Sequence, residues 1–102
     1  MLSQVQSQPA KNDRPIAPTI ILESRSQYQP CRILVPDLQQ SVAAILVEGE
    51  YYSFFKALEE PEKVLAIVAK LGNRNDRTAI TKIAKGYAIW VKEPEADAVK
   101  PS

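Results

Sequence analysis

Residues 42–57 read VAAILVEGEYYSFFKA and contain the pattern that decides the expected fold. An apolar run at Val42–Glu48 and an aromatic-rich run at Tyr51–Ala57 favour two β-strands. Glu48-Gly49-Glu50 is a tight turn in which Gly49 supplies a positive φ. The stretch predicts an antiparallel hairpin whose first strand is central and covered on both faces, or buried on one face and covered by a loop on the other.

The segment that follows has the features of a helix over Pro61–Leu71. Pro61 suits the first helical position, the acidic residues around it favour the positive end of the helix dipole, and Gly72 is expected as the C-terminal cap residue. Apolar residues at helical spacing form one face: Val64, Ile67, Val68 and Leu71, with Leu65 beside them. A second hairpin is expected from Thr78–Ile83 and Tyr87–Lys92, turning through residues 84–86.

Two short apolar runs precede the first hairpin, at Thr19–Glu23 and Cys31–Val35. The order is then strand, hairpin, helix, hairpin, which predicts an α+β domain: an antiparallel sheet of about five strands with one helix packed on one face. Residues 18–93 form this single domain. Residues 1–17 are rich in Gln, Ser and Pro and residues 94–102 are acidic with two Pro, so both are expected to be disordered tails.

The composition restricts the chemistry that the chain can perform. It has 102 residues, no histidine and one cysteine, which excludes histidine-based triads and zinc sites of the Cys/His type. Cys31 lies in an apolar strand and is interpreted as structural, although the neighbouring Arg32 could activate a thiol. Glu48 and Glu50 could pair as carboxylates, but turn residues are usually solvated. We therefore expect no catalytic residue, no cofactor and no metal.

The charge is unevenly distributed along the chain, although the net charge is only +1. From residue 63 to residue 92 the single acidic residue is Asp76, and the basic residues are Lys63, Lys70, Arg74, Arg77, Lys82, Lys85 and Lys92. This segment predicts a positive lobe able to steer an acidic partner. The alternative is an ordinary solvated face with lysines that protect strand edges.

Residues 31–93 resemble the core of the PsaD family, the ferredoxin-docking subunit of photosystem I. The similarity lies in Ala43-Ala44, Glu48-Gly49-Glu50, Phe55 and the alanine-rich helix, with Pro36 ahead of them and a strand–Gly86–strand hairpin after them. Family members are strongly basic and carry a basic C-terminal clamp, whereas this chain ends in an acidic segment, which favours a small cyanobacterial relative. The resemblance implies a non-enzymatic docking module.

The resemblance also implies a partner and a site. The partner is ferredoxin or another acidic protein, and the docking candidates are Arg74, Arg77, Lys82 and Lys85, to which Lys70 is added on charge alone. The first alternative is a single-stranded nucleic-acid binder that uses the same lobe and exposed sheet aromatics, for which Tyr51, Tyr52 or Trp90 would have to be bare. The second alternative is an accessory subunit of a larger complex, with an exposed apolar patch.

The expected location is cytoplasmic, including the cytosolic face of the thylakoid. The longest apolar run, Val42–Val47, is far shorter than the roughly 20 residues that span a bilayer. The first residues show neither the basic nor the apolar region of a secretory signal. We expect no insertion into a membrane.

Overall fold

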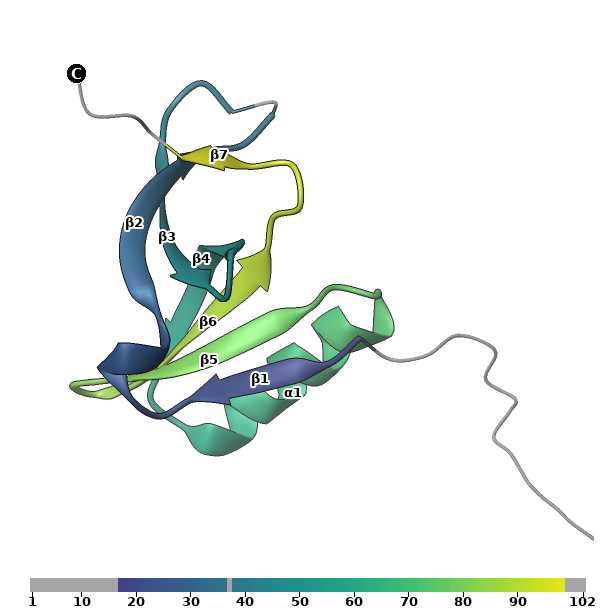
Figure 1. The fold of residues 1–102 in the computed structure, drawn as a ribbon. Coiled ribbons are helices and arrows are strands. Elements are labelled where there is room, and N and C mark those ends of the chain that lie inside the picture. The colour runs from purple at the N-terminus through teal and green to yellow at the C-terminus, as the bar shows by residue number, and fades with distance from the viewer. Residues whose placement is uncertain (1–16, 37, 99–102) are drawn as a thin grey trace, which may run out of the picture.

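The computed structural model describes residues 17–36 and 38–98 and confirms the predicted α+β class (Figure 1). The elements, in chain order, are β1 (Thr19–Leu22), the 3₁₀ turn η2 (Arg25–Gln27), β2 (Gln29–Leu34), β3 (Val42–Val47), β4 (Glu50–Leu58), α1 (Pro61–Asn73), β5 (Thr78–Ile83), β6 (Gly86–Lys92) and β7 (Asp97–Ala98).

The described strands form one sheet in the order β1-β5-β6-β4-β3-β2-β7. All neighbouring pairs are antiparallel except β1 and β5, which are parallel from Thr19↔Thr78 to Leu22↔Thr81. The sheet therefore has more strands than the expected five, and the pair formed by β1 and β5 is parallel where an antiparallel sheet was expected. Parallel pairing needs a long connection between the strands, and here that connection contains most of the domain.

The predicted hairpin of residues 42–57 is confirmed as β3 and β4. Val47 pairs with Glu50, and the turn residues Glu48 and Gly49 both have positive φ, 50° and 83°. The second hairpin is confirmed as β5 and β6, with Ile83 paired to Gly86. The local turn chemistry that the sequence contains is therefore sufficient to place both hairpins.

The sheet curls so that strands far apart in its order face each other across a core. Leu22 of β1 and Val47 of β3 belong to one buried cluster, although three strands separate them in the sheet. In Figure 1, β2 and β3 rise steeply from the layer formed by β1 and β5. Trp90 packs against this cluster, and its indole Nε1 donates a hydrogen bond to Thr81 Oγ1 at 3.0 Å.

The other face of β5 and β6 is covered by α1. The predicted apolar face of the helix is confirmed: Val64, Val68 and Leu71 are buried against Ile80 and Ile89. Side chains alternate along β6, with Tyr87, Ile89 and Val91 packed on the helix side and Trp90 on the other. The single helix therefore completes a second core.

The end of the helix differs from the prediction. α1 continues to Asn73, and Gly72 is a buried residue within it and not the cap residue. The backbone N–H of Arg74 donates to the carbonyls of Lys70 and Leu71, at 3.3 and 3.0 Å, and Asn75 takes the positive φ of 70°. Asparagine tolerates that conformation, so the chain needs no glycine to leave the helix here.

Ordered structure extends past both expected boundaries of the domain. Ala17 is buried, and its N–H donates to the carbonyl of Gly72 at 3.3 Å. At the other end β7 pairs with β2, with Ile33 opposite Ala98, in a segment expected to be disordered. Backbone pairing does not depend on apolar side chains, so an acidic segment can form it. The disorder expected of residues 1–16 and 99–102 lies outside the described residues.

Candidate protein-binding surface

The structure places the five predicted docking residues at two separate ends of the domain. Lys70 is in the last turn of α1, Arg74 caps that helix, and Arg77 lies just before β5. Lys82 is near the end of β5 and Lys85 is in the turn that follows. The rise along β5 separates Arg77 from Lys82 by about 16 Å, so the charges do not form one lobe.

A groove lies at the first of these ends, between β4 and the second half of α1. Its volume is about 440 Å³. The lining residues are Phe55 and Lys56 from β4, and Ile67, Lys70, Leu71 and Arg74 from α1 and its cap. Three of the six carry positive charge, three are apolar and none is acidic. The groove thus combines a cationic rim with an apolar floor.

A β-bulge in β4 brings two of these residues to the groove. The register with β6 runs Phe54↔Trp90 and then Lys56↔Ile89, so Phe55 is an extra residue with no partner. Bulges of this kind redirect side chains. Phe54 packs edge-on against Trp90, with ring centroids 5.5 Å apart, whereas Phe55 lines the groove and is 50% exposed.

The helix supplies the other wall and two of the charges. Lys70 and Arg74 are four residues apart, which places their side chains on one side of the helix. Both lie at the C-terminal end, where the helix dipole favours cations. Within residues 17–36 and 38–98, neither residue, nor Lys56, forms an ion pair with a carboxylate. All three side chains are exposed in the described part of the chain.

Sequence reasoning missed Phe55 and Lys56 as site residues. Phe55 was named only as part of the family resemblance, and Lys56 belongs to the half of the chain where acidic residues dominate. A signal was present, because adjacent Phe54 and Phe55 in a regular strand point to opposite faces, and a strand with one buried face cannot bury both. The bulge itself has no sequence signature that would have located it.

The second end of the domain has a different character. Lys82 lines a groove of about 460 Å³ between β1 and the first half of α1, together with Glu23 and the exposed Ile21 and Leu65. Its Nζ lies 5.6 Å from the centroid of the Tyr87 ring. This groove is mainly apolar and carries both signs of charge. Lys85 is exposed in the nearby turn and is not among the lining residues.

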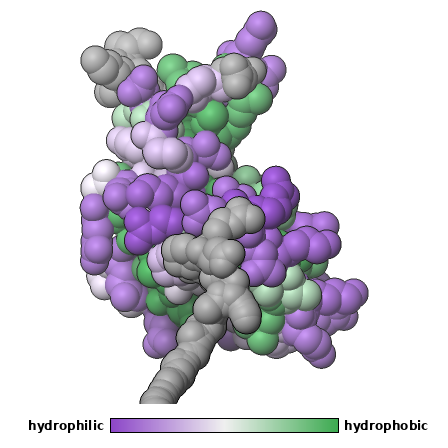
Figure 2. Space-filling view, turned by 90° about the vertical axis from the view of Figure 1, so that its right-hand side faces the viewer, coloured by the Kyte–Doolittle hydropathy of each residue, from purple (hydrophilic) through white to green (hydrophobic). Residues whose placement is uncertain are grey.

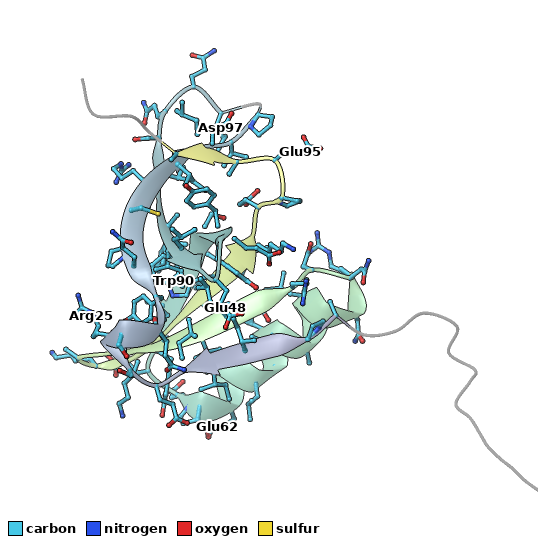
Figure 3. All side chains as sticks on the ribbon, in the orientation of Figure 1. Arg25, Glu48, Glu62, Trp90, Glu95 and Asp97 are labelled. Atoms are coloured by element: carbon cyan, nitrogen blue, oxygen red, sulfur yellow. The ribbon has the colours of Figure 1, made fainter. Side chains whose placement is uncertain are left out.

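The aromatic residues that a nucleic-acid site would need are mostly covered. Tyr52 is only 4% exposed and belongs to the core, while Tyr51 and Trp90 are half-buried. Figure 3 shows Trp90 inside the curl of the sheet, among the strands. The exposed rings are Phe54 and Phe55, and the bulge sends only Phe55 to the cationic groove. The described surface therefore offers one stacking ring beside the charges.

Glu48, Glu50 and Cys31, the residues weighed as candidates for catalysis, have the following surroundings. Glu50 forms an ion pair with Lys92, with Oε1 and Nζ 3.0 Å apart, and Glu48 is exposed at the turn (Figure 3). Burial raises the pKa of the Cys31 thiol, which lowers its thiolate fraction. The described residues contain no cluster of three or more His, Cys, Asp or Glu side chains arranged to hold a metal ion.

Comparisons with protein-family models, with curated proteins and with solved structures found no match. In the described part of the chain, no helix is both long enough and apolar enough to cross a bilayer. The side of the molecule toward which α1 ends is largely hydrophilic, with hydrophobic residues visible between the polar ones (Figure 2).

Proposed function

We propose that this protein is a non-enzymatic docking module that binds an acidic partner protein through the groove between β4 and α1. The observation that supports the proposal is the set of three exposed cations, Lys56, Lys70 and Arg74, around an apolar floor with no acidic residue in the lining. The partner class is an acidic electron carrier such as ferredoxin, or a photosynthetic complex with an acidic surface, as the resemblance to the PsaD family implies.

Charge complementarity of this kind acts mainly on the rate of encounter. Cations that line a concave surface focus the field and steer a carboxylate-rich partner toward it. Arg74 adds a planar guanidinium that can hold one carboxylate with two hydrogen bonds. Because the cations are exposed, salt screens the attraction over a Debye length of about 10 Å at 0.1 M. The proposed complex is therefore transient and sensitive to salt.

The proposal narrows the set of docking residues. Lys70 and Arg74 remain at its centre, and Lys56 joins them from the other wall of the groove. Arg77 lies near this end of the domain, outside the lining, and contributes through its longer-range field. Lys82 and Lys85 lie at the other end and are left out. Lys82 and Lys85 provide a matched control for Lys70 and Arg74, because neutralising either pair lowers the net charge by the same amount.

The experiment compares these two pairs. A [2Fe–2S] ferredoxin is titrated into the wild-type protein, into Lys70→Gln/Arg74→Gln and into Lys82→Gln/Lys85→Gln, by calorimetry at about 0.02 M and about 0.3 M salt. We expect the first variant to weaken binding about tenfold or more at low salt, and the second by less than about threefold. Equal losses in the two variants, or binding that salt does not weaken, would contradict the proposal.

Single-stranded nucleic acid is the second candidate, and the exposed ring of Phe55 beside three cations is the observation in its favour. Binding along a strand uses successive aromatic platforms, one per base. Phe54 packs with Trp90 and does not line the groove, which leaves a single ring. The groove therefore suits a protein segment better. A separate titration with a labelled oligothymidine under the same conditions decides between a protein partner and nucleic acid. Tighter binding of the oligonucleotide than of ferredoxin would favour nucleic acid.

A further inference from the structure

We infer that the groove between β4 and α1 recognises an acidic segment that carries one apolar side chain, seated on Phe55 with carboxylates on both sides. This inference rests on the proposed docking function and defines the chemistry of the partner more closely. It follows from the apolar floor of the groove, because attraction between charges does not require apolar lining residues. It distinguishes a partner with an anchor residue from a merely negative surface.

The exposure of Phe55 is the first observation. The bulge removes this ring from the regular alternation of β4 and leaves half of it exposed beside Ile67 and Leu71. The fold gains little from a phenylalanine in that position, because only half of its apolar surface is removed from water. A ligand side chain placed on the ring would remove more of that surface. The floor therefore favours an apolar anchor.

The arrangement of the charges is the second observation. Lys56 stands on the β4 wall, while Lys70 and Arg74 stand on the α1 wall, so that cations border the apolar floor on both sides. Binding interfaces commonly have this anatomy, with an apolar anchor in the centre and a polar rim around it. An anchor residue on Phe55 would have a cation available on either side. Carboxylates should therefore precede and follow the anchor in the bound segment.

The lining charges also distinguish this groove, as a site for an anionic ligand, from the groove between β1 and α1. The latter has more apolar lining but contains Glu23 as well as Lys82, so it has no preferred sign of charge. Nothing in the structure identifies the chemistry of a ligand for that surface. The groove at Phe55 contains cations without a lining carboxylate, which identifies an anionic ligand.

The test uses two fluorescein-labelled peptides of twelve residues with the same charge. Both consist of Glu, Gly and Ser, and they differ at the central position, which is Leu in one and Ser in the other. Fluorescence anisotropy at low salt measures the two dissociation constants. We expect the leucine peptide to bind about fivefold more tightly to the wild-type protein, which corresponds to partial burial of one leucine side chain.

Variants then assign the preference to the ring. Phe55→Ser should abolish the preference for leucine, whereas Phe54→Ser, which removes the neighbouring phenylalanine of 47% exposure, should retain it. Phe55→Gln keeps a longer side chain than serine but removes the apolar ring, and it should also abolish the preference. Backbone ¹H–¹⁵N spectra establish that each variant is folded and show whether the leucine peptide shifts the resonances of Ile67 and Leu71.

The outcomes separate this inference from the docking function on which it rests. Equal binding of the two peptides, with loss in Lys70→Gln/Arg74→Gln, overturns the anchor and leaves electrostatic docking intact. A preference for leucine that survives Phe55→Ser and Phe55→Gln also overturns the anchor. Peptide binding that is insensitive to Lys70→Gln/Arg74→Gln contradicts both. If the wild-type protein binds neither peptide, the anchor is overturned whatever the result with ferredoxin.

Discussion

Replacement of Gly86 by alanine should destabilise the fold severely, because two independent constraints act on this residue. Its φ is +135°, a conformation that L-residues rarely adopt. A Cβ built there would lie 2.7 Å from the Cα of Glu59 and in hard contact with the carbonyl oxygen of Leu58. Both obstacles are backbone atoms at the junction of β4 and α1, so no side chain can rotate away to make room.

The size of the effect follows from these two contributions. An unfavourable backbone conformation costs about 1–3 kcal/mol. A forced contact in a packed region costs typically about another 1–3 kcal/mol. The sum of about 2–6 kcal/mol is a large share of the free energy of unfolding, which for a domain of this size is about 5–10 kcal/mol. Gly49 is the matched control: its φ is +83°, but nothing lies within 4 Å of its Cβ position. Gly49→Ala should cost about 1–2 kcal/mol.

Urea unfolding followed by the fluorescence of Trp90, the single tryptophan, measures both variants. With a slope of about 1 kcal/mol per molar urea, the midpoint should fall by about 2–6 M for Gly86→Ala and by about 1–2 M for Gly49→Ala. A variant too unstable to show a folded baseline would agree with the upper end of the estimate. Equal midpoints for the two variants would refute the reasoning, since both glycines have positive φ and the contacts with Leu58 and Glu59 arise at Gly86 and not at Gly49.

Three further predictions concern single groups. Thr81→Val leaves the indole N–H of the half-buried Trp90 without its acceptor, so the free energy of unfolding should fall by about 1 kcal/mol in the same urea assay; an unchanged midpoint would contradict this. Burial raises the pKa of the Cys31 thiol, so iodoacetamide at pH 8 should alkylate the native protein several-fold more slowly than the urea-unfolded chain, and equal rates would count against it. Glu50→Gln removes the ion pair with Lys92, in which Glu50 is exposed and Lys92 is half-buried. This should lower the free energy of unfolding by at most about 1 kcal/mol at low salt and by less at 1 M salt; a larger loss, or one that salt does not reduce, would be inconsistent with a pair that salt can screen.

The elements that local chemistry specifies were predictable from the sequence. Gly49 between two β-favouring runs places the first hairpin, and Pro61 with an apolar face at helical spacing places α1. The partner of β1 was not predictable, because the pairing of Thr19 with Thr78 depends on how the whole sheet curls. The pairing of β7 with β2 was missed for a related reason: it uses backbone groups, which leave no apolar pattern in the sequence.

The candidate site was predictable only in part, for a geometric reason. Residues that are close along the chain, such as Arg77 and Lys82, lie toward opposite ends of one strand, so a count of charges along the sequence merges two distinct surfaces. Lys56 was missed because it comes from a separate, mainly acidic segment and meets Lys70 only through packing of α1 against the sheet. Phe55 joins them through the bulge in β4.

The parallel pairing of β1 with β5 also has a consequence for synthesis of the chain on the ribosome. Thr19 precedes its hydrogen-bonded neighbour Thr78 by 59 residues. At about 5–20 residues per second, β1 is made several seconds before the strand that receives it. During that time Ile20, Ile21 and Leu22 have no edge to join, and the core cluster that contains Leu22 stays open. The core cluster around Leu22 can therefore close only after β5 has been made.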